Sequence, residues 1–225
     1  MGKIISIDGI DGSGKATQSE MLYRDLLAQG KNVRLISFPD YENRSSTLVK
    51  MYLEGDFGKA PGDVNAYAAS TFFAVDRYAS FKQNWKEFYD QPDSVIIANR
   101  YTTSNAIHQL SKLDRDEWDD FLSWLEDFEY KKLGIPSPDL VIYLEMKPEI
   151  TFELLRRRVE LTGQKPDIHE LDMDYMQKSY KAALYASDKL GWKRIGCYDG
   201  KDPLSLEEIQ ALIAEQVVML LDVSQ

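Results

Sequence analysis

Residues 9–17 read GIDGSGKAT, which fits the pattern G-x-x-x-x-G-K-x-T of a loop that binds phosphate. A β-branched run at residues 3–8 precedes the loop and an amphipathic stretch at residues 15–29 follows it, so we expect a strand before it and a helix after it. Glycines let backbone N–H groups converge on a phosphate, and a helix N-terminus adds partial positive charge. Lys15 would reach the outer phosphates of a nucleoside triphosphate. This stretch therefore predicts a nucleotide site on an α/β fold.

The rest of the chain repeats the alternation of strand and helix. We expect further strands at residues 33–38, 94–98, 140–145 and 193–198. Helices are expected at residues 46–54, 64–89, 103–110, 116–131, 148–161 and 174–190, with a last helix after the capping-box pair Ser205 and Glu208. Strands separated by helices predict βαβ units and a parallel sheet covered on both faces. A length of 225 residues predicts a single domain, residues 1–225.

Composition narrows the class of protein. The formal net charge is −10, which argues against bulk affinity for nucleic acid or for an anionic membrane. No apolar run approaches the roughly 20 residues of a membrane span, and the first residues show no signal-peptide pattern. A single cysteine excludes a disulfide within the chain. We expect a cytoplasmic protein that binds neither nucleic acid nor membranes.

Three more segments, in this order after the loop, give the chain its resemblance to a known family. They are Phe38-Pro39-Asp40-Tyr41 followed by Arg44, then residues 72–77 (FFAVDR), then residues 99–109 (NRYTTSNAIHQ). Together with the loop they resemble the thymidylate kinases, P-loop enzymes that phosphorylate dTMP with ATP. The resemblance implies a three-layer P-loop NTPase fold, in which helices flank a five-stranded parallel sheet and a short lid lies at about residues 158–172.

The resemblance assigns the ATP site to the loop, that is to Gly9, Gly12, Ser13, Gly14, Lys15, Ala16 and Thr17. Ala16 departs from the usual pattern, in which a Ser or Thr hydroxyl at this position binds Mg²⁺. Either the metal site is damaged, or Mg²⁺ is held through water, as in adenylate kinases, whose Gly-Lys-Gly-Thr-Gln resembles residues 14–18 here. We favour the second interpretation, with ATP and Mg²⁺ as the expected donor and cofactor.

The acceptor site is expected from the three later segments. By resemblance, Phe38 lies at the site and Arg44 contacts the acceptor phosphate, although a solvated loop arginine is an equally good interpretation of Arg44. Phe73 would stack on the base, and Arg77, four residues later on the same helix face, would reach the base or the phosphate.

The segment at residues 99–109 starts where a predicted strand ends, which is where open α/β sheets bind ligands. Arg100 would hold the acceptor phosphate, because its planar fork matches phosphate oxygens. Asn105 would pair with the N3–H and O4 edge of thymine. By resemblance, Ser104 joins the substrate site and His108 lies near the sugar.

Mg²⁺ has few direct ligands in this sequence. The family's aspartate before the arginine is Asn99 here, which offers no carboxylate. With Ala16 also lacking a ligand, we expect Asp8 and Asp11 to form the metal environment. By resemblance, Asp11 also contacts the acceptor sugar.

Phosphoryl transfer needs positive charge near the transferred group. Lys15 and Arg100 supply part of it, and the run Arg156-Arg157-Arg158 before the expected lid would supply more. We expect Arg157 and Arg158 to be the catalytic members, while a basic last turn that complements the helix dipole is the alternative.

These features predict an ATP:dTMP phosphotransferase. The alternatives are a kinase for another nucleoside or deoxynucleoside monophosphate, and a silent nucleotide-binding protein marked by Ala16 and Asn99. The resemblance also implies a homodimer formed by helix packing. The apolar stripe of the helix at residues 116–131 is expected to be core, interface or both.

Overall fold

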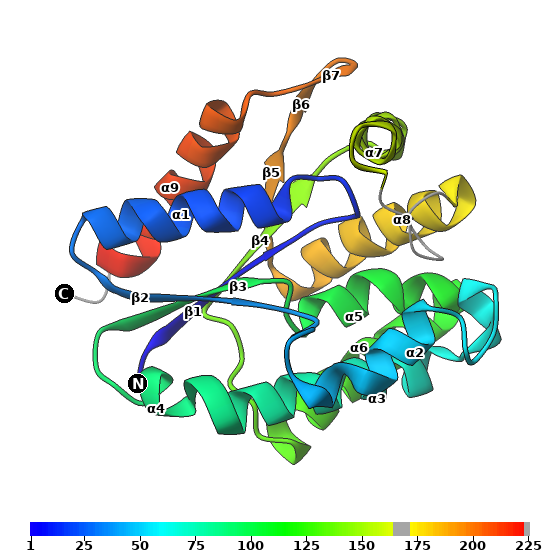
Figure 1. The fold of residues 1–225 in the computed structure, drawn as a ribbon, viewed down its shortest axis with the longest axis horizontal. Helices are drawn as coiled ribbons and strands as arrows, with labels where there is room; N and C mark the ends of the chain where they lie inside the picture. Colours follow the sequence, from blue (N-terminus) through cyan, green and yellow to red (C-terminus); the bar gives the residue numbers. More distant parts are fainter. Residues whose placement is uncertain (164–171, 223–225) are drawn as a thin grey trace.

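The central sheet has five parallel strands in the order β2-β3-β1-β4-β5 (Figure 1). A computed structural model describes residues 1–163 and 172–222 of the chain. The strands are β1 (Lys3–Asp8), β2 (Asn32–Ser37), β3 (Ser94–Asn99), β4 (Leu140–Glu145) and β5 (Lys193–Gly196). Each begins and ends within two residues of its prediction. β1 pairs with β3 and β4, so the phosphate-binding loop that follows it lies at the middle of the sheet.

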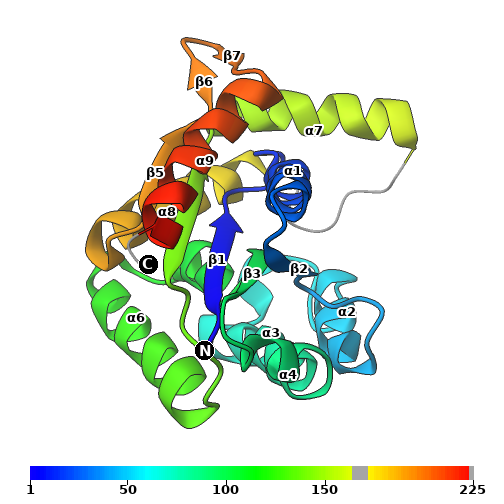
Figure 2. The ribbon, with the colours of Figure 1, turned by 90° about the vertical axis from the view of Figure 1, so that its left-hand side faces the viewer.

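Helices cover both faces of the sheet (Figures 1 and 2). One face packs against α1 (Lys15–Ala28) and α9 (Leu206–Asp222). The other packs against α4 (Lys86–Tyr89), α5 (Thr103–His108) and α8 (Met173–Leu190), and α3 (Ala66–Ser80) and α6 (Trp118–Glu126) lie on the same side (Figure 1). The short α2 (Thr47–Leu53) packs on α3, and α7 (Pro148–Thr162) packs beside α8. The predicted three-layer fold is confirmed.

Two of the predicted helices are interrupted in ways that periodicity did not predict. Residues 64–89 divide into α3, a π-helical turn at Phe81–Trp85, and α4. Likewise, α6 continues into a π-helical turn at Asp127–Lys132. A π-turn inserts one residue into a helix and rotates the following side chains onto a new face. The last predicted strand also ends early, and a hairpin follows, β6 (Tyr198–Asp199) with β7 (Asp202–Pro203).

The core explains the apolar patterns of the sequence. Ile5 and Ile7 of β1 pack toward α1 and α9, while Ile4 packs with Phe81 and Trp85 on the opposite face. The stripe on α6 is core, because Phe121, Leu122 and Leu125 pack against Ala182 and Ala186 of α8.

Most of the expected lid, at about residues 158–172, lies outside the described residues. None of the helices in the described part of the chain combines the length and the apolarity that a membrane crossing requires.

Candidate functional site

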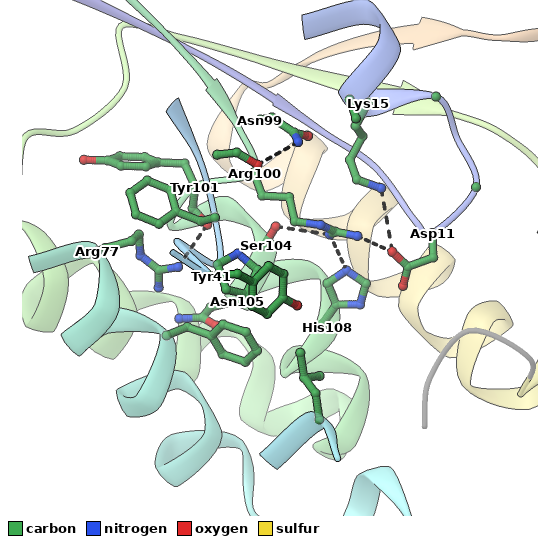
Figure 3. Close-up of a pocket in the computed structure, with 18 of the residues that line it drawn as sticks. Asp11, Lys15, Tyr41, Arg77, Asn99, Arg100, Tyr101, Ser104, Asn105 and His108 are labelled. Carbon is green, nitrogen blue, oxygen red and sulfur yellow. Dashed lines mark hydrogen bonds and ion pairs between the residues drawn. The ribbon is translucent and has the colours of Figure 1, made fainter. Parts of the chain in front are cut away.

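A pocket of about 600 Å³ opens beyond the carboxyl ends of β1, β2 and β3 (Figure 3). It lies between the phosphate-binding loop, the loop after β2, and helices α3, α5, α7 and α8. Ligand binding is expected from the sequence at this edge of the sheet, where the parallel strands end. The predicted site residues that line it are Asp11, Gly12, Gly14, Lys15, Ala16, Thr17, Phe38, Phe73, Arg77, Arg100, Ser104, Asn105 and His108.

Close packing shapes the phosphate-binding loop. A Cβ on Gly9 would lie 2.9 Å from the carbonyl oxygen of Leu144, and one on Gly12 would lie 2.9 Å from Cγ of Leu155. Gly12 and Gly14 both have left-handed φ angles, 82° and 88°. Glycine tolerates both the crowding and these angles, which is why the loop needs it. Gly14 then leads directly into α1.

The phosphate end of the pocket gathers two cations around one carboxylate. Lys15 donates from Nζ to the backbone oxygen of Ile10 at 2.9 Å, and its Nζ lies 3.9 Å from Asp11 Oδ1. Arg100 reaches the same oxygen of Asp11 from another direction (Figure 3). Arg100 follows β3 in a left-handed conformation, with φ of 65°. We define Lys15, Asp11 and Arg100 as the phosphate end, because its two cations suit bound phosphate groups.

A chain of hydrogen bonds extends from Arg100 to α8. Arg100 Nη1 donates to Nε2 of His108 at 3.0 Å, since a guanidinium has no acceptor. His108 is therefore protonated at Nδ1, which donates to the hydroxyl of Tyr175 at 3.2 Å. Arg100 also donates to Ser104 Oγ at 3.4 Å. These contacts orient the guanidinium within the pocket.

At the opposite end, a buried arginine pairs with a buried glutamate. Arg77 donates from Nε and Nη2 to the two carboxylate oxygens of Glu129, at 2.8 and 2.6 Å, and from Nη1 to the Tyr101 carbonyl at 3.3 Å. Asn105 Nδ2 donates to Glu129 at 3.0 Å and to the Ser70 carbonyl at 3.2 Å. Burial alone would lower the pKa of Arg77, but Glu129 outweighs burial and the pKa is raised. We define Arg77, Glu129 and Asn105 as the base end.

Phe73 lines the pocket from α3, four residues before Arg77, and its ring packs against Tyr52. Its ring makes an edge contact with Tyr52, with centroids 6.1 Å apart. Lys112 donates to the Tyr52 hydroxyl at 2.8 Å and to the Val64 carbonyl at 3.1 Å. Burial lowers the pKa of Lys112 to about 8.

Several predicted site residues lie elsewhere. Asp8 is fully buried, and its carboxylate accepts hydrogen bonds from the Gly9 N–H and from the Thr103 and Ser104 hydroxyls. It braces the loop against α5 and lies outside the pocket lining, which does not suit a metal ligand. Arg44 is exposed and also outside the lining, as expected of a solvated loop arginine.

The other predicted residues of the phosphate-binding loop and of the lid do not line the pocket among the described residues. Gly9 and Ser13 shape the loop without lining the pocket. Arg157 is exposed on α7 and is absent from the lining among the described residues. The side chain of Arg158 lies outside what the structure describes.

Sequence reasoning missed some pocket residues. Tyr41 and Tyr175 line it from the loop after β2 and from α8. Gln109 lines it with a buried side chain whose Oε1 has no hydrogen-bond partner among the described residues. Gln109 could have been predicted to line the pocket, because it follows His108 directly in the segment at residues 99–109. Glu129 had none, because it lies in the unpredicted π-turn.

The described residues offer few oxygen ligands for Mg²⁺. Within residues 1–163 and 172–222, no three His, Cys, Asp or Glu side chains gather to hold a metal. Mg²⁺ commonly binds proteins through one or two carboxylates and takes its other ligands from substrate phosphates and water. Asp11, at the phosphate end, fits that limited role.

The pocket thus joins a phosphate-binding loop to the guanidinium of Arg100. The fold and the site together define the class of ATP-dependent P-loop kinases. The sequence comparison agrees, since residues 7–200 match the thymidylate kinase family.

Among curated proteins, the chain is 31% identical to the thymidylate kinase of Mycobacterium tuberculosis over 187 residues, which cover 81% of this chain and 84% of the relative. It is 30% identical to that of Schizosaccharomyces pombe over 151 residues (66% and 63%), and 27% identical to that of Homo sapiens over 146 residues (65% and 62%). The chain belongs to the thymidylate kinase family. It is a nucleoside monophosphate kinase, an ATP-dependent phosphotransferase, as the sequence predicted.

Proposed function

We propose that this protein transfers the γ-phosphate of ATP to dTMP and releases dTDP. The observation that carries the proposal is the polarity of the pocket. One end holds Lys15 and Arg100, and the other holds Arg77 and Asn105 (Figure 3). Phe73 lines the same pocket from α3, four residues before Arg77. A nucleoside monophosphate laid along the pocket would meet cations at its phosphate and hydrogen-bonding groups at its base.

Each part of the site then has a chemical task. The backbone N–H groups of the loop and Lys15 hold the ATP phosphates and neutralise the charge that develops on the transferred group. Arg100 holds the dTMP phosphate in line for attack. That phosphate has a second pKa of about 6, so at pH 7 its oxygen is already ionised and the reaction needs no general base. The pocket therefore acts by positioning and electrostatics.

Mg²⁺ belongs to the proposal as a cofactor that arrives with ATP. When bound, it would neutralise phosphate charge, with Asp11 as the residue of this chain best placed to hold its shell. Ala16 offers no ligand, so contact through water is the arrangement that the residues favour.

We also propose a homodimer. Tyr67, Val75 and Tyr78 are exposed and share one face of α3, at spacings of eight and three residues. An exposed apolar face of this kind is typical of an interaction surface. Light scattering after gel filtration would decide between monomer and dimer. A cytoplasmic location stays a prediction.

ADP release from ATP and Mg²⁺ tests the reaction, with dTMP, dUMP, dGMP, dCMP, AMP and thymidine as acceptors. We expect the highest kcat/KM with dTMP, no turnover with thymidine, and loss of turnover when EDTA removes the metal. Turnover with another monophosphate in place of dTMP would keep the reaction class and overturn the acceptor. No turnover from folded protein that binds ATP would overturn the proposal.

A further inference from the structure

Glu129 touches no part of the pocket surface, yet it contacts both polar groups of the base end. Its side chain is fully buried in the π-turn after α6, more than 20 residues from Asn105 in sequence and 52 from Arg77. One carboxylate oxygen accepts from Arg77 Nη2 and from Asn105 Nδ2, and the other accepts from Arg77 Nε. A buried ion pair is a poor source of net stability, so stability alone does not explain this arrangement.

The carboxylate fixes which way the Asn105 amide faces. Glu129 and the Ser70 carbonyl can only accept hydrogen bonds, so both must face the Nδ2 group of Asn105. The amide oxygen is then turned away from them. Figure 3 shows the nitrogen of Asn105 on the side of Arg77 and the oxygen on the other side. Asn105 therefore offers the pocket an acceptor.

The same carboxylate fixes the donors of Arg77. Three of the five N–H groups of its guanidinium donate to Glu129 and to the Tyr101 carbonyl. The remaining two have no acceptor among the described residues, and Arg77 borders the pocket although it is only 1% exposed. The base end thus presents N–H donors beside a carbonyl acceptor.

We propose that Glu129 is a positioning residue that makes the base end select a keto base, with a C=O next to an N–H, over an amino base. This inference rests on the proposed function and names the group that sets its base specificity. The O4 and N3–H of thymine or uracil complement a donor from Arg77 and an acceptor from Asn105. Cytosine would place its N4 amino group against the donor and its unprotonated N3 against the acceptor.

The matched ligands dUMP and dCMP test this directly, because they differ only at this edge. The dissociation constants of both are measured by calorimetry for the wild type and for Glu129→Gln, and kcat and KM are measured beside them. The amide of Gln offers one acceptor oxygen to the three donors that Glu129 now satisfies, which frees Asn105 to turn its Nδ2 toward the pocket. We expect wild-type preference for dUMP, and a fall of about tenfold to hundredfold in that preference in the variant. The fall should come mainly from KM.

Asp76→Asn is the matched control. Asp76 is the neighbour of Arg77 and equally buried, but its carboxylate accepts from the Asp40 N–H and the Ser45 hydroxyl. This variant loses a buried charge and should keep the wild-type ratio of dUMP to dCMP affinity. Glu129→Asp is the second test variant, since it keeps the charge and shortens the side chain. We expect a several-fold fall in its ratio, and this variant decides the matter where Glu129→Gln does not fold.

A folded Glu129 variant that weakens both ligands in parallel, with an unchanged ratio, would overturn the positioning role, as would a wild type that binds dUMP and dCMP equally. The proposed function fails separately. It fails where the wild type discriminates the two bases in binding but forms no diphosphate from dTMP.

Discussion

The pocket uses two arginines in opposite ways. Arg100, at the phosphate end, is 20% exposed, and its contacts include the carboxylates of Asp11 and Asp8 as well as Ser104 and His108. Arg77, at the base end, is 1% exposed and its charge is matched by Glu129. Both guanidinium groups pair with carboxylates, but Arg100 borders the open pocket, where a phosphate can compete with Asp11 for it, whereas Arg77 is buried against Glu129 and presents only directed N–H groups. Arginine therefore has two uses in this pocket. In the proposed function, Arg100 attracts the acceptor phosphate, and Arg77 orients the base.

The largest expected effect is on stability at the base end. Arg77→Met leaves Glu129 buried without a cation, which should lower the free energy of unfolding by about 3–5 kcal/mol. Urea unfolding measures it. The exposed pair of Arg24 with Glu20 provides the control, since Arg24→Met should cost less than about 1 kcal/mol. A similar small loss for both variants would contradict the difference drawn here.

Next in size is the loss of charge at the phosphate end. Lys15→Ala should lower kcat about 10²- to 10³-fold, because one donor to the transferred phosphate is gone. Steady-state kinetics with ATP and dTMP measures this, and dTMP affinity should change little. As a control, Lys31→Ala changes an exposed lysine in the turn between α1 and β2 and should retain wild-type kcat. A kcat within a few-fold of wild type in Lys15→Ala would remove Lys15 from the chemistry.

The substitution Arg100→Lys distinguishes binding of the acceptor phosphate from binding of its base. A lysine keeps the positive charge but loses the planar fork and its bond to His108, so kcat/KM for dTMP should fall about tenfold to hundredfold. Thymidine has no phosphate, and its dissociation constant should stay as in the wild type. Steady-state kinetics measures kcat/KM for dTMP, and calorimetry measures the dissociation constants of dTMP and thymidine. Equal weakening of dTMP and thymidine would mean that Arg100 also serves the base.

The smallest expected effect is the pH dependence of stability that comes from Lys112, which donates to Tyr52 beside Phe73. Burial lowers the pKa of Lys112 to about 8, from an ordinary 10.5. Between these values the unfolded chain holds a proton that the folded chain has released, so the contribution of Lys112 to stability rises with pH. From pH 7 to pH 9 the rise should be about 1 kcal/mol.

Denaturant unfolding of the wild type and of Lys112→Met at both pH values measures this rise. The difference between the two proteins isolates Lys112, because Cys197, whose pKa burial raises to about 12, is common to both. Parallel pH profiles would contradict the assignment.

Much of this architecture could be predicted from the sequence, because it depends on local signals. The glycine pattern at residues 9–17 and five β-branched runs are each readable within about ten residues. Parallel strands bring their carboxyl ends to one edge, so the predictions for Lys15, Arg77, Arg100 and Asn105 converged on one pocket.

The sequence says least where distant segments determine the environment of a residue. Asp8 reads as a candidate metal ligand, but Thr103 and Ser104, almost a hundred residues away, occupy its carboxylate. Arg44 follows β2 by only a few residues, as a pocket residue would. In the structure, however, Arg44 is exposed outside the pocket lining, and Tyr41 of the same loop lines the pocket. Glu129 was hidden by the π-turn, because a helical period of 3.6 residues does not anticipate an inserted residue.

The most direct measurement is a competition between two acceptors in one mixture. The protein is given ATP, Mg²⁺ and equal amounts of dTMP and dCMP, and the nucleoside diphosphates formed are separated by anion-exchange chromatography. The proposed pocket predicts that dTDP accumulates while dCMP remains almost unphosphorylated. Equal formation of dTDP and dCDP, or no diphosphate from either acceptor by folded protein that binds ATP, would contradict it.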